Sequence, residues 1–491
     1  LKMEKVGKKL TKELFSEAQT YAQKIVDGLN TAVSPFHSVE TVKKLLKDKD
    51  FIEIKEPDKW TLVGGQKYFF TRNNTTICAF QVGESCTAGS APPDCFKIVG
   101  CHTDSPTVRV APISDIETQG YKEVAIQWYG GALWHTWLDR DLTFAGRVIV
   151  LNEETGKLED KFWHHPEPIL RIPNLCPHLQ GMDERESLKI NKEEHLRPVI
   201  ATSIIDSLMD LDETGEEKKA TETESKYSIE KKHLKSFLAL MAEGIGAKVE
   251  NIVDFELSMV DTNKSCIMGL HKEFISSGRL DNMLSSLCAT HALLEVSQEK
   301  LLDQSVNLIY LFDHEEIGSL SAQGADGSIV NDSLQRIYAS FNEGNIDAGY
   351  KQALRNSMVI SADMAHAIHP NYQHKHQSKH CPKLHQGIVL KSNCNQRYTT
   401  DSVSSAIIRE ICSRVDVPLQ DFIVKQDIPC GSTIGPALSA NTGIKTVDIG
   451  APQLAMHSCR EMCGTTDAYY YHKLFASFFK NLREVSSTLL D

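Results

Sequence analysis

The chain has 491 residues, 41% hydrophobic and 24% charged, and this ordinary globular composition excludes a disordered or fibrous protein. Asp and Glu outnumber Lys and Arg by 65 to 53, so the formal net charge is −12 and we expect no nucleic-acid partner. No apolar run reaches the ~18 residues of a spanning helix, and the charged start lacks a secretory signal, so we expect no membrane partner either.

The 13 cysteines do not suggest a disulfide framework. Their number is odd, none forms a C-x-x-C pair, and several lie inside apolar runs, such as Cys78 in TTICAFQV and Cys288 in MLSSLCATHALL. Reduced, buried cysteines are typical of a protein of the reducing cytosol. We therefore expect a cytoplasmic location.

Local patterns predict the first elements of the chain. Apolar residues three or four apart predict a helix over residues 7–30, and a second helix over 38–48 opens with a cap at Ser38. The segments KYFFTR and TTICAFQV read as paired strands. Asn73 and Asn74 join them, and Asn tolerates the positive φ of a tight turn.

The middle of the chain has a different texture. Short β-like runs (EVAIQWYG, AGRVIVLN) alternate with Gly and Pro, which predicts a β-rich domain over residues 106–252 inserted into a domain formed by 1–105 and 253–491. The charged stretch 212–226 has no apolar residue other than Ala220 and is expected to be an exposed loop.

After residue 253, apolar strands alternate with helical stretches such as 281–296 and 401–415. This alternation predicts an α/β sheet with helices on its faces. The predicted strands are SVNLIYLFD, SMVISADM, GIVLKSN, DFIVKQD and IKTVDIG.

Several predicted strands end in residue types that bind metals. In open α/β sheets, functional sites collect at the carboxyl ends of the strands, so we expect these residues to share one site. Imidazole and carboxylate ligands without thiolate suit zinc, manganese or cobalt, and two adjacent ions need a bridging carboxylate. The candidates at or near strand ends are His102, Asp104, Glu315, Glu316, Asp363 and His457, and Asp281 opens a helix.

Two local spacings refine this hypothesis. His102 and Asp104 are two residues apart, hence on one face of an extended segment, so the Asp104 carboxylate can orient the His102 ring. Glu315 and Glu316 are neighbours whose side chains diverge. One can bind metal while the other acts as a general base.

Seven ordered motifs resemble the aspartyl and vacuolar aminopeptidases, which are dizinc exopeptidases. The resemblance implies a mixed-sheet α/β exopeptidase domain with helices on both faces, interrupted by an inserted β-rich dimerisation domain. The motifs are HTDSPTVRV (102–110), WLDRDLTFAGRV (137–148), GRLDN (278–282), DHEEIGS (313–319), SADMAHAIHPNY (361–372), CGSTIGP (430–436) and PQLAMHSCRE (452–461).

The resemblance also implies two zinc ions per subunit, with Mn²⁺ or Co²⁺ as substitutes, and hydrolysis by a metal-activated water. Glu315 is the implied general base, and a solvated acidic pair at a strand end is the alternative for Glu315 and Glu316. The implied ligands are His102, Asp281 and Asp363 for one zinc, and Glu316 and His457 for the other, with Asp281 bridging.

Substrate choice is implied by a second group of residues. One branch of this family prefers acidic N-terminal residues. Resemblance to that branch implies that Lys391 places a positive charge opposite the carboxylate of an N-terminal Asp or Glu, with Tyr398 nearby. The alternative for Lys391 is a surface lysine after a strand. His178 resembles the histidine that reaches into a neighbouring subunit's site, and an ordinary loop histidine is its alternative.

Residues 366–385 contain six histidines, which could suggest a further metal cluster. The polar surroundings of His374, His376 and His380 favour a loop, whereas His366 and His369, within the motif SADMAHAIHPNY, are expected to shape the pocket and a subunit contact. The six are His366, His369, His374, His376, His380 and His385.

The resemblance implies a homo-dodecamer built from dimers that trims peptides with an acidic N-terminus. Two other functions stay open. A neutral-preferring aminopeptidase of the same family would differ in its first-residue specificity, and a non-catalytic, zinc-stabilised assembly would lack peptidase activity.

Overall fold

The computed structural model describes residues 10–209 and 226–488, so all but the last residue of the predicted loop 212–226 lies outside the described part. The chain divides into two compact units. The first unit comprises Leu1–Ser105, Ser265–Met456 and Arg460–Asp491, and the second comprises Pro106–Lys264 and His457–Cys459.

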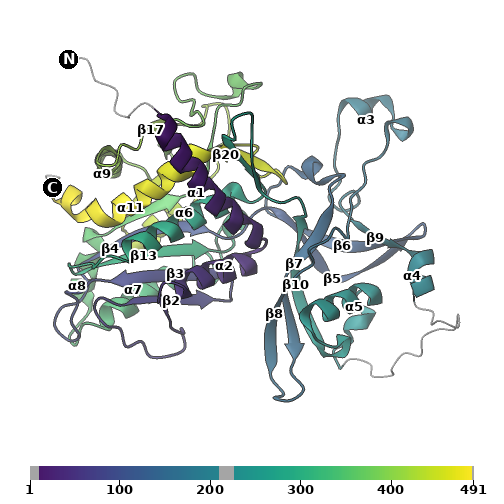
Figure 1. Cartoon of the computed structure of the whole chain (residues 1–491), viewed down its shortest axis with the longest axis horizontal. Coiled ribbons are helices and arrows are strands. Elements are labelled where there is room, and N and C mark those ends of the chain that lie inside the picture. Colours follow the sequence, from purple (N-terminus) through teal and green to yellow (C-terminus); the bar gives the residue numbers. More distant parts are fainter. Residues whose placement is uncertain (1–9, 210–225, 489–491) are drawn as a thin grey trace. The chain divides into compact units, whose positions relative to one another are not determined.

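A nine-stranded mixed sheet forms the centre of the first unit (Figure 1). Its four middle strands, β13, β4, β14 and β18, are mutually parallel. The strands in sheet order are β1 (Ile52–Glu53), β2 (Lys67–Arg72), β3 (Thr76–Val82), β13 (Ser305–Phe312), β4 (Cys95–His102), β14 (Met358–Ala362), β18 (Lys445–Gly450), β16 (Ile388–Lys391) and β17 (Leu419–Phe422).

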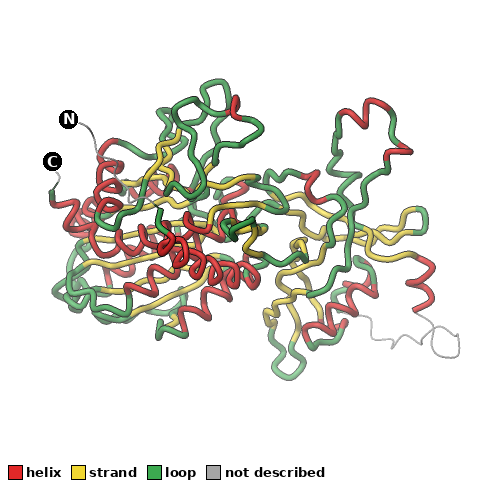
Figure 2. The backbone as a smooth tube through the Cα atoms, turned by 45° about the horizontal axis from the view of Figure 1, so that its top comes forward, coloured by secondary structure: helices red, strands yellow, loops and turns green. Residues whose placement is uncertain are grey.

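Helices cover both faces of this sheet, which confirms the predicted α/β class (Figure 2). Strand residues alternate between two cores, since Val99 of β4 belongs to one core and Ile98 to the other. One core contains residues of α1 (Lys12–Thr31), α2 (Pro35–Lys47), α6 (Leu280–Val296), α9 (Ser402–Ser413) and α11 (Thr465–Ser487); the other contains residues of α7 (Ile329–Ala339), α8 (Asp347–Asn356) and α10 (Ile434–Thr442).

Most predicted elements of the first unit are present, with shifted ends. The tight turn is confirmed, because Asn73 and Asn74 have φ of 54° and 55° between β2 and β3. The predicted start of the second helix at Ser38 is wrong. α2 begins at Pro35, because Ser34 caps it by accepting the His37 amide and proline suits the first helical position.

The second unit is built on a six-stranded antiparallel sheet, with α5 (Lys235–Ile245) contributing to its core. The sequence predicts that residues from 253 onward belong to the other domain. In the structure, β10 pairs along nearly its whole length with β7 and belongs to this sheet. Its strands in order are β8 (Leu158–His164), β7 (Leu142–Leu151), β10 (Ile252–Asp261), β5 (Thr107–Thr118), β6 (Tyr121–Tyr129) and β9 (Val199–Thr202).

A smaller five-stranded sheet completes the first unit. The strands of the small sheet in order are β11 (Cys266–Met268), β12 (Phe274–Ser277), β20 (Glu461–Gly464), β19 (Pro452–Leu454) and β15 (Ala365–His366).

No helix among residues 10–209 and 226–488 combines the length and apolar character needed to cross a membrane.

Candidate active site

Three parallel strands bring distant residues to one edge of the central sheet. β13, β4 and β14 are neighbours, so their carboxyl ends lie at the same edge. His102 is the last residue of β4, Asp363 follows β14, and Glu315 and Glu316 lie in the 3-10 turn after β13. Strand order therefore gathers residues that are up to 261 positions apart in the sequence.

His102 lies in the middle of this cluster. Its Nε2 atom is 3.3 Å from Asp281 Oδ1, 3.7 Å from Asp363 Oδ1 and 3.8 Å from Glu315 Oε2. The side chains of His102 and Asp281 are buried, whereas Glu315 and Asp363 each keep 13% of their side-chain surface exposed. These two carboxylates therefore retain access to solvent.

Asp281 is held at the start of α6 by other segments of the first unit. Its amide donates to Glu461 Oε2 at 3.0 Å, and its carbonyl accepts a 2.6 Å hydrogen bond from Ser105. Asn282 donates through Nδ2 to the Ala362 carbonyl at 2.7 Å. Asp281 and Asn282 have non-helical backbone angles, so tertiary contacts, and not helical hydrogen bonds, fix the position of Asp281.

Asp104 links His102 to the two glutamates. Its carboxylate accepts the amide of Glu315 at 3.2 Å through Oδ1 and that of Glu316 at 3.1 Å through Oδ2. His102 Nδ1 lies 3.0 Å from the Asp104 main-chain carbonyl and 3.3 Å from Oδ1. One buried residue thus positions an imidazole and the turn that carries both glutamates.

The cluster shifts the protonation of its own members. Burial, reinforced by the charges of Asp363, Asp104 and Asp281, raises the pKa of Glu315 to about 8 against the opposing effect of His102. Burial alone would lower the pKa of His102, but the Glu315 charge and hydrogen bonds to the neighbouring carboxylates outweigh burial and raise it well above the usual value. The close carboxylates therefore disfavour the charged form of Glu315 and favour the charged form of His102. A bound divalent cation would favour the charged form of the carboxylates.

The donor set fits a divalent cation. In each of two groups, one ligand atom per residue lies within 4.8 Å of the others, and both groups share His102. Imidazole and carboxylate oxygens are suitable ligands for zinc, and a divalent ion would balance the concentrated carboxylates. The groups are His102, Glu315 and Asp363, and His102, Asp281 and Glu316.

Lys391 adds a buried cation beside this cluster. It is the last residue of β16 and is 3% exposed, so the surface position considered as its alternative is wrong. Its Nζ is 3.6 Å from Asp363 Oδ2 and 5.5 Å from the centre of the Tyr398 ring. Tyr398 is also buried, and burial raises its pKa.

Two predicted site residues belong to the second unit. His457 lies in its short segment His457–Cys459, with Nδ1 at 3.0 Å from the Gly131 carbonyl oxygen. His178 is exposed in the 3-10 turn Pro177–Leu179. Their roles, as a zinc ligand and as a substrate-binding residue, stay predictions.

Glu461 is a residue of the site that sequence reasoning missed. It is 3% exposed in β20, where it accepts the Asp281 amide and, through Oε1, the Gln453 side chain at 3.3 Å. The only sequence signal is its place at the end of the PQLAMHSCRE motif. Its partner Asp281 is 180 residues away, so no local pattern predicts this contact.

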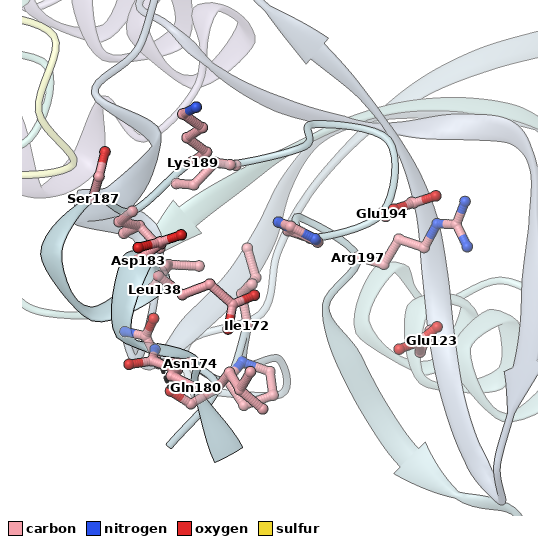
Figure 3. A pocket seen from close by; sticks show the side chains of 16 residues that line it. Glu123, Leu138, Ile172, Asn174, Gln180, Asp183, Ser187, Lys189, Glu194 and Arg197 are labelled. Carbon is pink, nitrogen blue, oxygen red and sulfur yellow. Dashed lines mark hydrogen bonds between the residues drawn. The ribbon is translucent and has the colours of Figure 1, made fainter. Parts of the chain in front are cut away.

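The second unit has a cavity of its own, of about 860 Å³, which extends from Asn174 and Gln180 to Glu194 and Arg197 (Figure 3). None of the predicted site residues lines it. Both acidic and basic side chains line it, together with apolar ones such as Ile172, so charge alone does not indicate one class of ligand.

An α/β sheet that gathers an imidazole and several carboxylates at the carboxyl ends of its parallel strands defines a metalloenzyme. The family model described as aminopeptidase I zinc metalloprotease (M18) matches residues 29–479. The chain therefore belongs to this family of zinc-dependent aminopeptidases, as its motifs predicted.

Individual relatives match over nearly their whole length. A probable aspartyl aminopeptidase of Ricinus communis is 44% identical over 95% of this chain and 96% of its own, and an aspartyl aminopeptidase of Aspergillus oryzae is 41% identical over 96% and 98%. In the solved complex of Ape4 and Nbr1, one chain has a TM-score of 0.90 and 37% identity, covering 99% of this chain and 90% of that one. A Saccharomyces cerevisiae mApe1 dodecamer has a TM-score of 0.80 and 28% identity, covering 96% and 99%.

Proposed function

We propose that this aminopeptidase removes an unblocked N-terminal Asp or Glu from peptides. The supporting observation is Lys391, a buried ammonium group 3.6 Å from Asp363 at the edge of the cluster. A buried cation next to the reacting groups favours an acidic substrate side chain over a neutral one. Relatives named aspartyl aminopeptidases support the same substrate class.

Two zinc ions per subunit are part of this proposal. Together the two groups of candidate ligands offer one imidazole and four carboxylates, which is more than the four ligands that a single zinc ion takes and so supports a second ion. Manganese and cobalt are proposed substitutes, because nitrogen and oxygen ligands also bind these ions. The proposed ligands are His102, Asp281 and Asp363 for one ion, and Glu316 and His457 for the other, with Asp281 bridging.

Side chains of the protein have the other proposed roles in catalysis and substrate binding. Zinc, when bound, acidifies water and polarises the substrate carbonyl. Glu315 takes a proton from the attacking water and returns it to the leaving amine. Lys391, with Tyr398 beside it, holds the acidic side chain of the first residue, and Asp104 holds His102 and the turn carrying Glu315 in place.

The test of substrate class compares Asp-Ala and Leu-Ala dipeptides in the zinc-loaded protein. We expect the wild type to prefer Asp-Ala, and Lys391→Met to lower kcat/KM for Asp-Ala by at least tenfold while changing Leu-Ala much less, because only Asp loses its charge partner. Lys379→Met, at an exposed lysine, is the control. Equal losses on both dipeptides, or a wild type that prefers Leu-Ala, would favour the neutral-preferring alternative.

Glu315→Gln tests the general base. The amide keeps the size of the side chain but cannot accept a proton, so we expect kcat to fall by at least 10². Zinc content, measured by atomic emission, should stay near that of the wild type. Turnover within tenfold of wild type would exclude Glu315 as the base, and an inactive wild type would favour the non-catalytic assembly.

We also propose that the protein forms a homo-dodecamer, built from dimers that associate through the second unit, and that it is located in the cytoplasm. The dodecameric relative and the thirteen free cysteines support it. His178 would then serve the site of a neighbouring chain. Light scattering should give the mass of twelve chains, and His178→Ala should lower activity without lowering that mass; a monomeric mass would contradict the assembly.

A further inference from the structure

We propose that the first unit contains a second anionic subsite, which binds a carboxylate of the peptide beyond its first residue. We call this subsite the basic pocket, and its lining includes Lys375, Lys425, His366, His369 and His376. This inference rests on the proposed function, because it extends the recognition of acidic peptides from the first residue to later ones.

The lining of the basic pocket is one-sided in charge. Two lysines and three histidines line a cavity of about 290 Å³, and no aspartate or glutamate is among the lining residues. The whole chain has 65 acidic residues and a net charge of −12, so a pocket whose charged side chains are all basic departs from the average charge of the chain. Such a pocket favours an anionic ligand.

The remaining wall of the basic pocket is largely apolar. Side chains such as Phe422, Val424, Pro429, Leu454 and Met456 complete it. A carboxylate next to an apolar wall is less hydrated than in open solvent, so its attraction to the lysines is stronger there. The wall also gives room for the aliphatic part of a peptide residue.

Tyr398 connects the basic pocket to the active site. It lines the pocket, and its ring centre is 5.5 Å from the ammonium of Lys391, which is 3.6 Å from Asp363. Lys391 itself does not line the pocket. An extended peptide advances about 3.3–3.6 Å per residue, so a peptide with its first side chain at Lys391 can present a second or third residue beyond Tyr398.

Lys375 and Lys425 both act electrostatically on Asp427. Both stabilise the charged form of Asp427, which forms a 2.9 Å ion pair with Lys425, and the hydrogen bond from Lys425 is the main reason that the pKa of Asp427 is lowered. Asp427 lies outside the lining. It offsets one of the two lysines, so removing its charge should strengthen the subsite.

The test is a panel of amidated tripeptides with Asp or Leu first, Ala second and Glu or Gln third. We expect kcat/KM to be about three- to tenfold higher with Glu than with Gln at the third position, mainly through KM, for exposed ion pairs of this kind. Asp-Ala-Ala is also compared as the free acid and as the amide. This comparison tests whether the C-terminal carboxylate can bind the basic pocket in place of the Glu side chain. The preference should weaken at high salt.

Matched variants test whether the basic pocket causes the preference for Glu over Gln at the third position. In Lys375→Gln/Lys425→Gln the Glu-to-Gln ratio should fall to about 1, and in Asp427→Asn it should rise about twofold. Lys379→Gln, which removes a charge from the same loop outside the pocket, should leave the ratio unchanged. A ratio near 1 in the wild type, or a ratio unchanged in the double variant, would overturn the inference.

The panel separates this inference from the proposed function. The Asp-to-Leu ratio at the first position reports on Lys391, and the Glu-to-Gln ratio at the third position reports on the basic pocket. If the double variant instead lowers the Asp-to-Leu ratio alone, the basic pocket serves the first side chain and the inference of a separate subsite is wrong.

Discussion

Asp104 is the residue on which several parts of the active site converge. It is completely buried, and its two carboxylate oxygens accept the amides of two consecutive residues, Glu315 and Glu316. It also lies within 3.3 Å of the His102 ring. Because it is buried and both of its carboxylate oxygens already accept backbone amides, we regard Asp104 as a positioning residue.

Asp104→Asn should therefore impair the site without removing a ligand. The amide has only one oxygen, so one of the two backbone N–H groups loses its acceptor, and we expect activity or zinc affinity to fall about 10–100-fold. Measuring kcat and the zinc dissociation constant together separates the two effects. Ser114→Ala, at a buried polar residue of the second unit, controls for general loss of stability, and wild-type values for both quantities in Asp104→Asn would contradict this role.

At the scale of elements, α1, α6 and α11 pack together around two largely buried histidines. Tyr21 of α1 lies 3.3 Å from His291 Nδ1 of α6, and its ring stacks on His472 of α11 at 4.8 Å. His472 Nε2 is 3.3 Å from Glu295 Oε2. Burial lowers the pKa of both histidines to about 4, so both are neutral in the folded protein at pH 7.

This packing makes stability depend on pH. Between about pH 4 and 6.5 the unfolded chain binds protons at His291 and His472 that the folded chain does not, so stability should fall as the pH drops through this window, by about 1–2 kcal/mol per histidine at pH 5. The midpoint of thermal unfolding at pH 7 and pH 5 measures it. The drop should be smaller in His291→Gln and unchanged in the exposed control His374→Gln. An equal drop in all three proteins would contradict this cause.

At the scale of the whole molecule, the first unit concentrates buried carboxylates at one edge of its sheet while the second unit contributes an independent antiparallel sheet and core. The raised pKa of Glu315 reflects burial together with the repulsion of three nearby carboxylates. Burying like charges without a counter-ion destabilises a fold. A bound zinc ion would balance these carboxylates, so we expect it to stabilise the first unit as well as to serve catalysis.

Zinc removal should therefore lower the stability of the protein. We expect chelation to reduce the midpoint of thermal unfolding by several degrees and added zinc to restore it in proportion to the logarithm of its concentration, because an ion that binds only the folded state stabilises it by mass action. Scanning calorimetry with and without chelator measures the effect. In Asp281→Asn the response to zinc should be weaker, and a midpoint that does not change on chelation in the wild type would refute the idea.

The sequence by itself determined the α/β class, the tight turn at Asn73 and Asn74, and the family, because side-chain period, turn chemistry and motifs are local properties of the chain. Tertiary structure alone decided that Lys391 is buried beside Asp363, that Glu461 holds Asp281, and that β10 belongs to the second unit. These facts depend on which strands become neighbours. Strand order joins residues hundreds of positions apart, and no local pattern records it.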